Sequence, residues 1–155
     1  MSNLELFLKR TLKPFNYKKV GKRWYRIDSS QKLCNVIQIT KDGYGHGEFL
    51  RFGICLIGIQ HYLDIPPSVY DCAFYGNHWM VIDKGENLYY KREIAEEKDF
   101  LLKDFEILFL QKALPLFEEI SNLLYLKDNF PENWKNDILY TQVFNNKEIT
   151  EYLNS

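Results

Sequence analysis

The feature that most constrains the fold is the stretch of residues 22–59, in which apolar runs are separated by two turn signals. Apolar residues recur from Trp24 to Ile27, stop at the Asp-Ser-Ser sequence of residues 28–30, and resume from Leu33 to Ile39. Strands alternate apolar and polar side chains, and turns are rich in Asp and Ser. The pattern therefore predicts a β-hairpin.

A third strand is predicted after the second break, residues 41–47, which contain three glycines. Glycine adopts the positive-φ conformations that tight or bulged connections need. In the run that follows, residues 49–59, Leu50, Phe52, Ile54 and Leu56 form one apolar row, and the other row has its polar member, Arg51, early and is apolar later. Successive side chains of a strand point to opposite faces, so the second half of this strand should be buried on both sides.

Helices are predicted near both ends of the chain. Ser2 and Asn3 can cap an amphipathic helix that ends at Pro14. A later helix opens at residues 96–99, where early carboxylates suit the positive end of the helix dipole. Its predicted apolar side consists of Leu101, Phe105, Leu108 and Phe109.

Pro115 cannot lie in the interior of that helix without consequence, because it removes a hydrogen bond. Either the helix kinks there, or a second helix begins near Ala113 with Pro115 in its first turn. The second segment carries Leu116, Phe117, Ile120, Leu123 and Leu124 and ends at residues 128–131. A short capped helix is expected at about residues 146–153.

The middle of the chain gives weaker patterns. Residues 60–68 contain two prolines and predict a connection or an edge. Residues 69–75 predict a short strand, 79–82 an apolar run, and 83–87 a turn. Taken with the flanking segments, the sequence predicts one α+β domain over residues 1–155, with a mainly antiparallel sheet of about four to six strands, an N-terminal helix and C-terminal helices.

Several short motifs follow one another in a distinctive order: Leu12-Lys13-Pro14, Tyr17-Lys18-Lys19, Arg23-Trp24-Tyr25-Arg26, Val36-Ile37-Gln38-Ile39, Phe52-Gly53-Ile54, Cys72 and Ala113-Leu114-Pro115-Leu116-Phe117. In this order, over residues 4–126, they resemble the bacterial family called domain of unknown function 4304. The resemblance implies a small α+β domain with a mixed or antiparallel sheet. It implies no activity, so no functional residues transfer from it.

Charge divides unevenly along the chain. Residues 1–82 hold 11 Lys and Arg against 6 Asp and Glu, a net +5, whereas residues 83–155 hold 9 against 15, a net −6. The short basic patch at residues 18–23 is unlike a nucleic-acid-binding arm. The N-terminus has the pattern of neither a signal peptide nor a membrane span. Three widely spaced cysteines in apolar contexts indicate buried thiols, which favours a cytoplasmic location.

Motifs for metal binding and covalent catalysis are missing from the sequence. The three histidines, His46, His61 and His78, have no zinc-ligand spacing, although His61, Cys72 and His78 could be assembled in space. No Gly-x-Ser-x-Gly occurs, and the glycines of residues 43–47 precede no helix, so nucleophile-elbow and phosphate-loop motifs are both missing. We therefore expect neither a metal nor a cofactor.

Two classes of function remain. The first is a non-catalytic protein-binding module, for example a bacterial immunity protein that covers a basic toxin domain through an acidic surface. Its candidate contact residues are Glu93, Glu96, Glu97, Asp99, Glu118 and Glu119. If these acidic residues do not contact the partner, the alternative contact surface is the aromatic one at Tyr89, Tyr90 and Trp134. The second class is a small enzyme with a non-standard site around Arg23, Arg26, Arg51 and the histidines.

Overall fold

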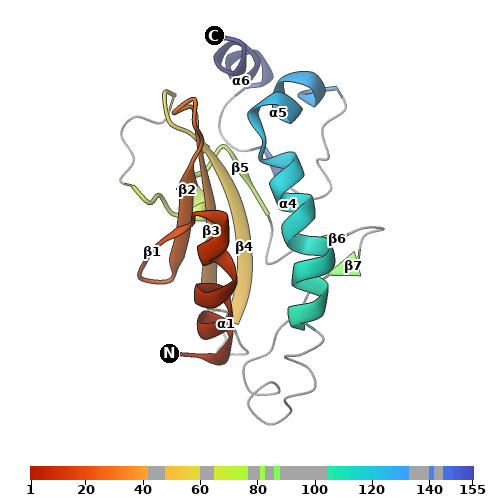
Figure 1. The fold of residues 1–155 in the computed structure, drawn as a ribbon. Coiled ribbons are helices and arrows are strands. Elements are labelled where there is room, and N and C mark those ends of the chain that lie inside the picture. The colour runs from red at the N-terminus through yellow and green to blue at the C-terminus, as the bar shows by residue number, and fades with distance from the viewer. Residues whose placement is uncertain are drawn as a thin grey trace.

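The computed structural model describes residues 1–41, 48–59, 65–76, 81–82, 86–87, 105–132, 140–141 and 145–155 (Figure 1). The first half holds α1 (Asn3–Leu12), β1 (Lys18–Val20), β2 (Arg23–Ile27), β3 (Leu33–Lys41) and β4 (Glu48–Leu56). The second half holds β5 (Phe74–Tyr75), β6 (Val81–Ile82), β7 (Glu86–Asn87), α4 (Leu114–Ile120), α5 (Leu123–Asn129), β8 (Tyr140–Thr141) and α6 (Asn146–Leu153). Ser2 caps α1 by accepting a hydrogen bond from the Glu5 backbone N–H, as its position predicted.

The main sheet has the strand order β1-β2-β3-β4-β5-β8, and every neighbouring pair in it is antiparallel. Trp24 lies opposite Ile37, which in turn lies opposite Phe52. The strands predicted within residues 22–59 are therefore consecutive neighbours, and the predicted α+β class is confirmed. β6 and β7 pair separately.

One face of the sheet is covered by helices. Phe7 of α1 meets Phe109 edge to face, with ring centroids 5.6 Å apart, and Phe52 of β4 meets Phe117 of α4 at 4.5 Å. Such aromatic pairs add specific contacts to the burial of apolar area. Leu50, Phe52, Ile54 and Leu56 of β4 belong to this core, so the predicted apolar face is confirmed.

The other face carries a smaller apolar cluster of Cys34, Val36, Cys55, Val69 and Cys72. It is covered by the turn of 3₁₀-helix at Val69–Asp71. The second half of β4 is therefore buried on both sides, as predicted, although the strand ends at Leu56 and not at Ile59, and Gly58 is exposed.

Four local predictions need correction. Val69–Asp71 is a 3₁₀ turn and not a strand, because the Ser68 hydroxyl caps it by accepting the Tyr70 N–H. Glu86–Asn87 forms β7 where a turn was predicted. An extra strand, β1, precedes the predicted three, and it turns into β2 at Gly21, whose φ is +60°.

The fourth correction concerns the helical half. The single segment predicted after Pro115 is two helices, because the chain turns at residues 121–122 and Asn122 caps a new helix, α5. Leu124, one of the apolar residues named for that segment, is 66% exposed. Pro115 lies in the first turn of α4, directly after a π-helical turn at Phe109–Ala113. Residues 94–104, where that helix was predicted to open, lie outside the described residues.

The C-terminal helix, α6, closes one end of the sheet. The Tyr152 hydroxyl donates to the Lys32 carbonyl at 3.0 Å and accepts from the Gly58 N–H at 2.7 Å. These bonds join the helix to the β2–β3 turn and to the end of β4. Across the described segments, none of the helices has the length and apolar character needed to cross a bilayer.

Candidate functional site

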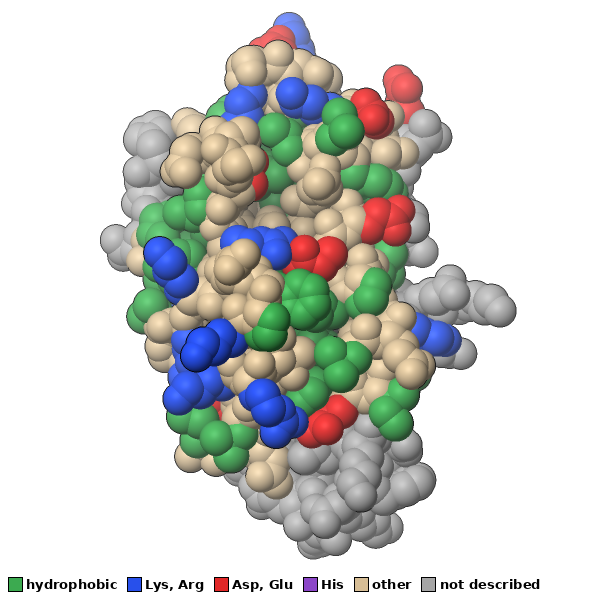
Figure 2. Space-filling view, viewed as in Figure 1, with side chains coloured by type: hydrophobic (Ala, Val, Ile, Leu, Met, Phe, Trp, Pro, Cys, Tyr) green, Lys and Arg blue, Asp and Glu red, His purple; other side chains and the backbone are tan. Residues whose placement is uncertain are grey.

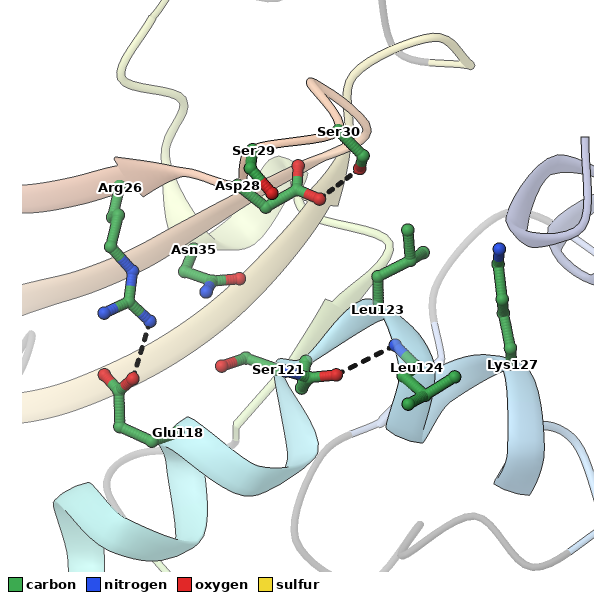
Figure 3. Close-up of a pocket in the computed structure, with 11 residues that line it drawn as sticks. Arg26, Asp28, Ser29, Ser30, Asn35, Glu118, Ser121, Leu123, Leu124 and Lys127 are labelled. Atoms are coloured by element: carbon green, nitrogen blue, oxygen red, sulfur yellow. Dashed lines mark hydrogen bonds and ion pairs between the residues drawn. The ribbon is translucent and has the colours of Figure 1, made fainter.

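A polar pocket of about 360 Å³ lies between the β2–β3 hairpin and the corner where α4 meets α5 (Figure 3). It is lined by residues from the hairpin and from the helical corner: Arg26, Asp28, Ser29, Ser30, Asn35, Glu118, Ser121, Asn122, Leu123, Leu124 and Lys127. Polar side chains thus meet at one end of the interface between sheet and helices, which is otherwise apolar.

The sheet contributes Arg26 and Asn35, which are direct cross-strand partners. Side chains alternate along a strand, so Asn35 shares its face with Leu33 and Ile37, the face that the helices cover. Asn35 is only 3% exposed. An amide side chain therefore occupies a core position in an otherwise apolar row.

The helical corner contributes Glu118 and Ser121. α4 ends at Ile120, and the Ser121 N–H still donates to the Phe117 carbonyl at 2.9 Å. Asn122 then starts α5 by accepting the Leu124 N–H at 2.9 Å. The change of helix direction leaves Ser121 facing the sheet, where Figure 3 shows its side chain between the corner and Asn35.

An ion pair crosses the pocket wall. Arg26 Nη2 donates to Glu118 Oε2 at 2.7 Å, and Arg26 Nη1 donates to the Phe15 carbonyl at 3.0 Å. Tyr17 stacks under the guanidinium, with its ring centroid 4.7 Å away, and its hydroxyl donates to Glu118 Oε1 at 3.3 Å. The pair is therefore fixed from three sides and holds the carboxylate in one position.

The same surroundings affect two proton equilibria. Burial raises the pKa of the Tyr17 hydroxyl, and the neighbouring Glu118 carboxylate raises it further. Burial acts against the charge on Arg26, but Tyr17 and Glu118 outweigh it, and the pKa of Arg26 is raised. At neutral pH the guanidinium that lines the pocket is therefore charged, and the phenol of Tyr17 against it is neutral.

Two residues that line the pocket each have a buried side-chain atom without a hydrogen-bond partner among the described residues: Asn35 Oδ1 and Ser121 Oγ. Ser121 is 2% exposed. A buried polar group left unpaired costs about 1–3 kcal/mol, so such groups are rare in native folds. Both residues line the same cavity.

The remaining lining residues have structural tasks or form the rim. Asp28 Oδ1 accepts the N–H groups of Lys32 and Leu33, at 2.9 and 2.7 Å, and its other oxygen accepts from the Ser30 hydroxyl. Asp28 therefore holds the hairpin turn. Leu123 is half-buried and Lys127 is exposed at the rim.

The sequence-predicted acidic residues do not form one described surface. Glu118 is in the pocket wall and is paired with Arg26, while its neighbour Glu119 is exposed. The other four, Glu93, Glu96, Glu97 and Asp99, lie outside the described residues, as do Tyr89, Tyr90 and Trp134. The acidic-surface hypothesis therefore stays a prediction.

The arginines predicted for an enzyme site are divided between the two faces of the sheet. Arg23 and Arg51 flank Gln38 on the outer face, whereas Arg26 lies on the helix-covered face. Arg23 donates to the Pro66 carbonyl at 3.1 Å, and Arg51 donates to the Thr40 hydroxyl at 3.2 Å. Both outer arginines therefore support neighbouring segments. His46, His61 and His78 lie outside the described residues.

Sequence reasoning missed Asn35 and Ser121. One signal could have found Asn35: it is the polar residue in the otherwise apolar row Leu33, Asn35, Ile37 and Ile39. Ser121 becomes a site residue only through the helix corner, which the sequence did not predict.

No group of three or more His, Cys, Asp or Glu side chains within the described segments is arranged to hold a metal ion. No family model, curated protein or solved structure matches the chain. The resemblance to domain of unknown function 4304 therefore stays a prediction.

Proposed function

We propose that this protein is a non-catalytic binding module whose recognition site is the pocket at Arg26, Asn35, Glu118 and Ser121, and that its ligand is a small uncharged molecule bearing a primary amide. The observation that supports this most directly is the pair of unpartnered buried atoms, Asn35 Oδ1 and Ser121 Oγ, on two residues that line one cavity. An occupant that bonds to both removes the cost of burying them.

The charges of the wall favour a neutral ligand. Arg26 and Lys127 are balanced by Asp28 and Glu118, so the lining carries no net charge. Arg26 is already paired with Glu118, so an anionic ligand would have to compete with a fixed carboxylate at 2.7 Å.

The two unpartnered atoms indicate the functional group. The Asn35 oxygen accepts a hydrogen bond, and the Ser121 hydroxyl donates one. A primary amide carries an N–H donor and a carbonyl acceptor on the same carbon, so one amide group can satisfy both residues. Leu123 and Leu124 add apolar contact for the carbon chain behind it.

The test compares three small molecules of nearly the same shape: propionamide, propionate and propylammonium. Protein-observed NMR titration should give saturable binding of propionamide, with a Kd on the order of millimolar for so small a ligand. The two charged analogues should bind much more weakly. Equal binding of propionate would contradict the proposed ligand class.

Three variants locate the binding. Asn35→Leu and Ser121→Ala should each abolish saturable binding of propionamide, because each removes one of the two hydrogen bonds. Asn146→Leu, at an exposed position on α6, is the control and should bind as the wild type does. Unchanged binding in both pocket variants would show that the amide binds elsewhere.

A second candidate function is binding of a basic protein partner, for example a toxin domain, through the acidic second half. It is supported by the charge split of +5 against −6 and by the exposure of Glu119. Figure 2 shows Lys and Arg side chains gathered on the side of β1 and β2, and acidic side chains mostly on the helical side. A cytoplasmic location, consistent with the free cysteines, belongs to the same hypothesis.

The second candidate has its own test, carried out with a partner isolated by affinity purification. Association should slow as salt rises, since the screening length falls to roughly 10 Å at 0.1 M. Reversing Glu96 and Glu97 to Lys should also lower the on-rate and leave the Tm nearly unchanged. If the association rate changes neither with salt nor with the double reversal, Tyr89, Tyr90 and Trp134 become the better candidate contact residues.

A further inference from the structure

The outer face of the sheet brings three thiols together, on the side away from the polar pocket. Cys34 and Cys55 are direct cross-strand partners in β3 and β4, and Cys72 follows the 3₁₀ turn that covers them. Their exposures are 0%, 2% and 0%, and all three are free. Neither the proposed ligand site nor the acidic surface uses them.

Two of the three sulfur atoms are in contact. The Cys55 thiol donates to Cys72 Sγ at 2.7 Å, and the Cys72 thiol donates to the Ser68 carbonyl at 3.6 Å. The close approach depends on Gly53, because a Cβ at that position would lie 2.8 Å from Cys72 Sγ. The missing side chain lets Cys72 reach the sheet beside Cys55.

We propose that Cys55 and Cys72 are a redox modification site, which forms a reversible disulfide when the protein meets a small peroxide such as hydrogen peroxide. The bond would join β4 to residues 65–76, the segment that covers the outer face. That segment is already positioned by Arg23, which donates to the Pro66 carbonyl, and by the Val69 N–H, which donates to Gln38 Oε1 at 3.0 Å.

The reaction balances with hydrogen peroxide as the oxidant. One of the two thiols loses its proton, and the thiolate attacks a peroxide oxygen; the O–O bond breaks, and the leaving hydroxide takes up that proton as water. The resulting sulfenic acid is attacked by the thiolate of the other cysteine. The S–O bond breaks, a second water leaves, and the S–S bond forms. Two thiols are thereby oxidised and one peroxide is reduced to two waters.

Burial determines which oxidants are effective and how fast they react. Residues that are 0% and 2% exposed are closed to peroxides and disulfides alike until the covering segment opens locally, and a molecule as small as hydrogen peroxide needs a much smaller opening than a bulky disulfide does. Burial also raises the pKa of Cys72, as does its hydrogen bond with Cys55, so little thiolate is present at neutral pH. The site should therefore respond to sustained peroxide more than to a brief exposure.

Cys34 provides an internal control. It belongs to the same buried cluster, and burial raises its pKa to about 12. Its sulfur makes no hydrogen bond with Cys55 or Cys72 among the described residues, whereas those two sulfurs are in contact, so Cys34 should remain a thiol when the pair is oxidised. Peptide mapping distinguishes oxidation of Cys55 and Cys72 from oxidation of Cys34. Trypsin leaves Cys55 and Cys72 in one peptide, residues 52–84, and Cys34 in another, residues 33–41.

The experiment treats the folded wild-type chain with hydrogen peroxide, then unfolds it and alkylates free thiols with N-ethylmaleimide. We expect the intact mass before alkylation to fall by two hydrogens, the peptide of residues 52–84 to escape alkylation, and the peptide of residues 33–41 to be alkylated. Dithiothreitol should restore alkylation of both. A cross-link that includes Cys34, or oxygen addition without loss of two hydrogens, would overturn the proposal.

Variants and thermal stability give a second readout. Cys34→Ser should still form the cross-link, whereas Cys55→Ser and Cys72→Ser should not. Closing the 17-residue loop should raise the Tm of oxidised wild type by about 5–10 °C, reversibly with dithiothreitol. An oxidised wild type with an unchanged or lower Tm would contradict the proposed joining of the two segments.

Discussion

Replacing Asn35 by Leu should stabilise the protein while it removes the proposed ligand site. Asn35 is 3% exposed, lies between Leu33 and Ile37 on the core face, and is opposite Ile54 on the next strand. Its amide oxygen has no partner among the described residues. A leucine of similar size removes that unpaired group and adds apolar contact with three apolar neighbours.

The magnitude follows from the cost of the buried oxygen. An unsatisfied buried acceptor costs about 1–3 kcal/mol, and Asn is also among the residues depleted in strands. The bond that Asn35 would make to a ligand contributes nothing to the unliganded fold. We therefore expect Asn35→Leu to raise the free energy of unfolding by about 1–2 kcal/mol, or the Tm by about 3–6 °C in a domain of this size.

Urea unfolding followed by tryptophan fluorescence measures the change, with the m-value checked for constancy. Ile54→Ala is the control in the neighbouring strand and should lower stability by about 2–5 kcal/mol, because it leaves a cavity in the core. If Asn35→Leu instead lowers stability by about 1 kcal/mol or more, Asn35 is paired within the fold and the reasoning about the pocket is wrong.

Three further predictions concern the rest of the fold. Ile54→Asp should show no cooperative thermal transition, because it places an unpaired carboxylate at a position that is 0% exposed; a cooperative transition would contradict the burial. The hydrogen bond from Lys19, at 2.8 Å, lowers the pKa of Glu5 in the folded protein. The ionised carboxylate therefore stabilises the fold at any pH above the pKa of Glu5 in the unfolded chain, and this stabilisation is lost as the pH falls through the lower pKa of the folded protein. Glu5→Gln should remove that part of the acid sensitivity in pH-dependent unfolding; an unchanged pH profile would contradict it. Elemental analysis of purified protein should show no stoichiometric zinc or iron; one zinc per chain that is lost on substituting His61 and His78 would revive the enzyme hypothesis.

The sheet could be predicted because its signal is local. Apolar alternation in residues 23–27, 33–39 and 49–57, separated by Asp, Ser and Gly, determines both the strands and the face that each side chain takes. Antiparallel neighbours joined by short turns need no further information. The short strand β1 was missed because three residues, Lys18–Val20, are too few to show alternation.

The candidate site could not be predicted because the contacts that form it join residues far apart in the sequence. Arg26 and Glu118 are 92 positions apart, and the contact between them depends on how α4 packs across the sheet. Ser121 faces Asn35 because the chain changes direction there, a consequence of the Asn122 cap that hydrophobic periodicity does not reveal. The sequence indicated Glu118 as a free acidic residue, whereas tertiary packing made it the partner of Arg26.

The most direct test of the binding proposal observes the Asn35 side-chain amide itself, by ¹⁵N-selective NMR of asparagine-labelled protein as propionamide is added. We predict that the Asn35 side-chain signals shift in a saturable way. The signals of Asn129 and Asn154, whose amides donate to backbone carbonyls within α5 and near the end of α6, should stay in place. Stationary Asn35 signals at saturating propionamide, or equal shifts of all three residues, would contradict the assignment of this pocket as the recognition site.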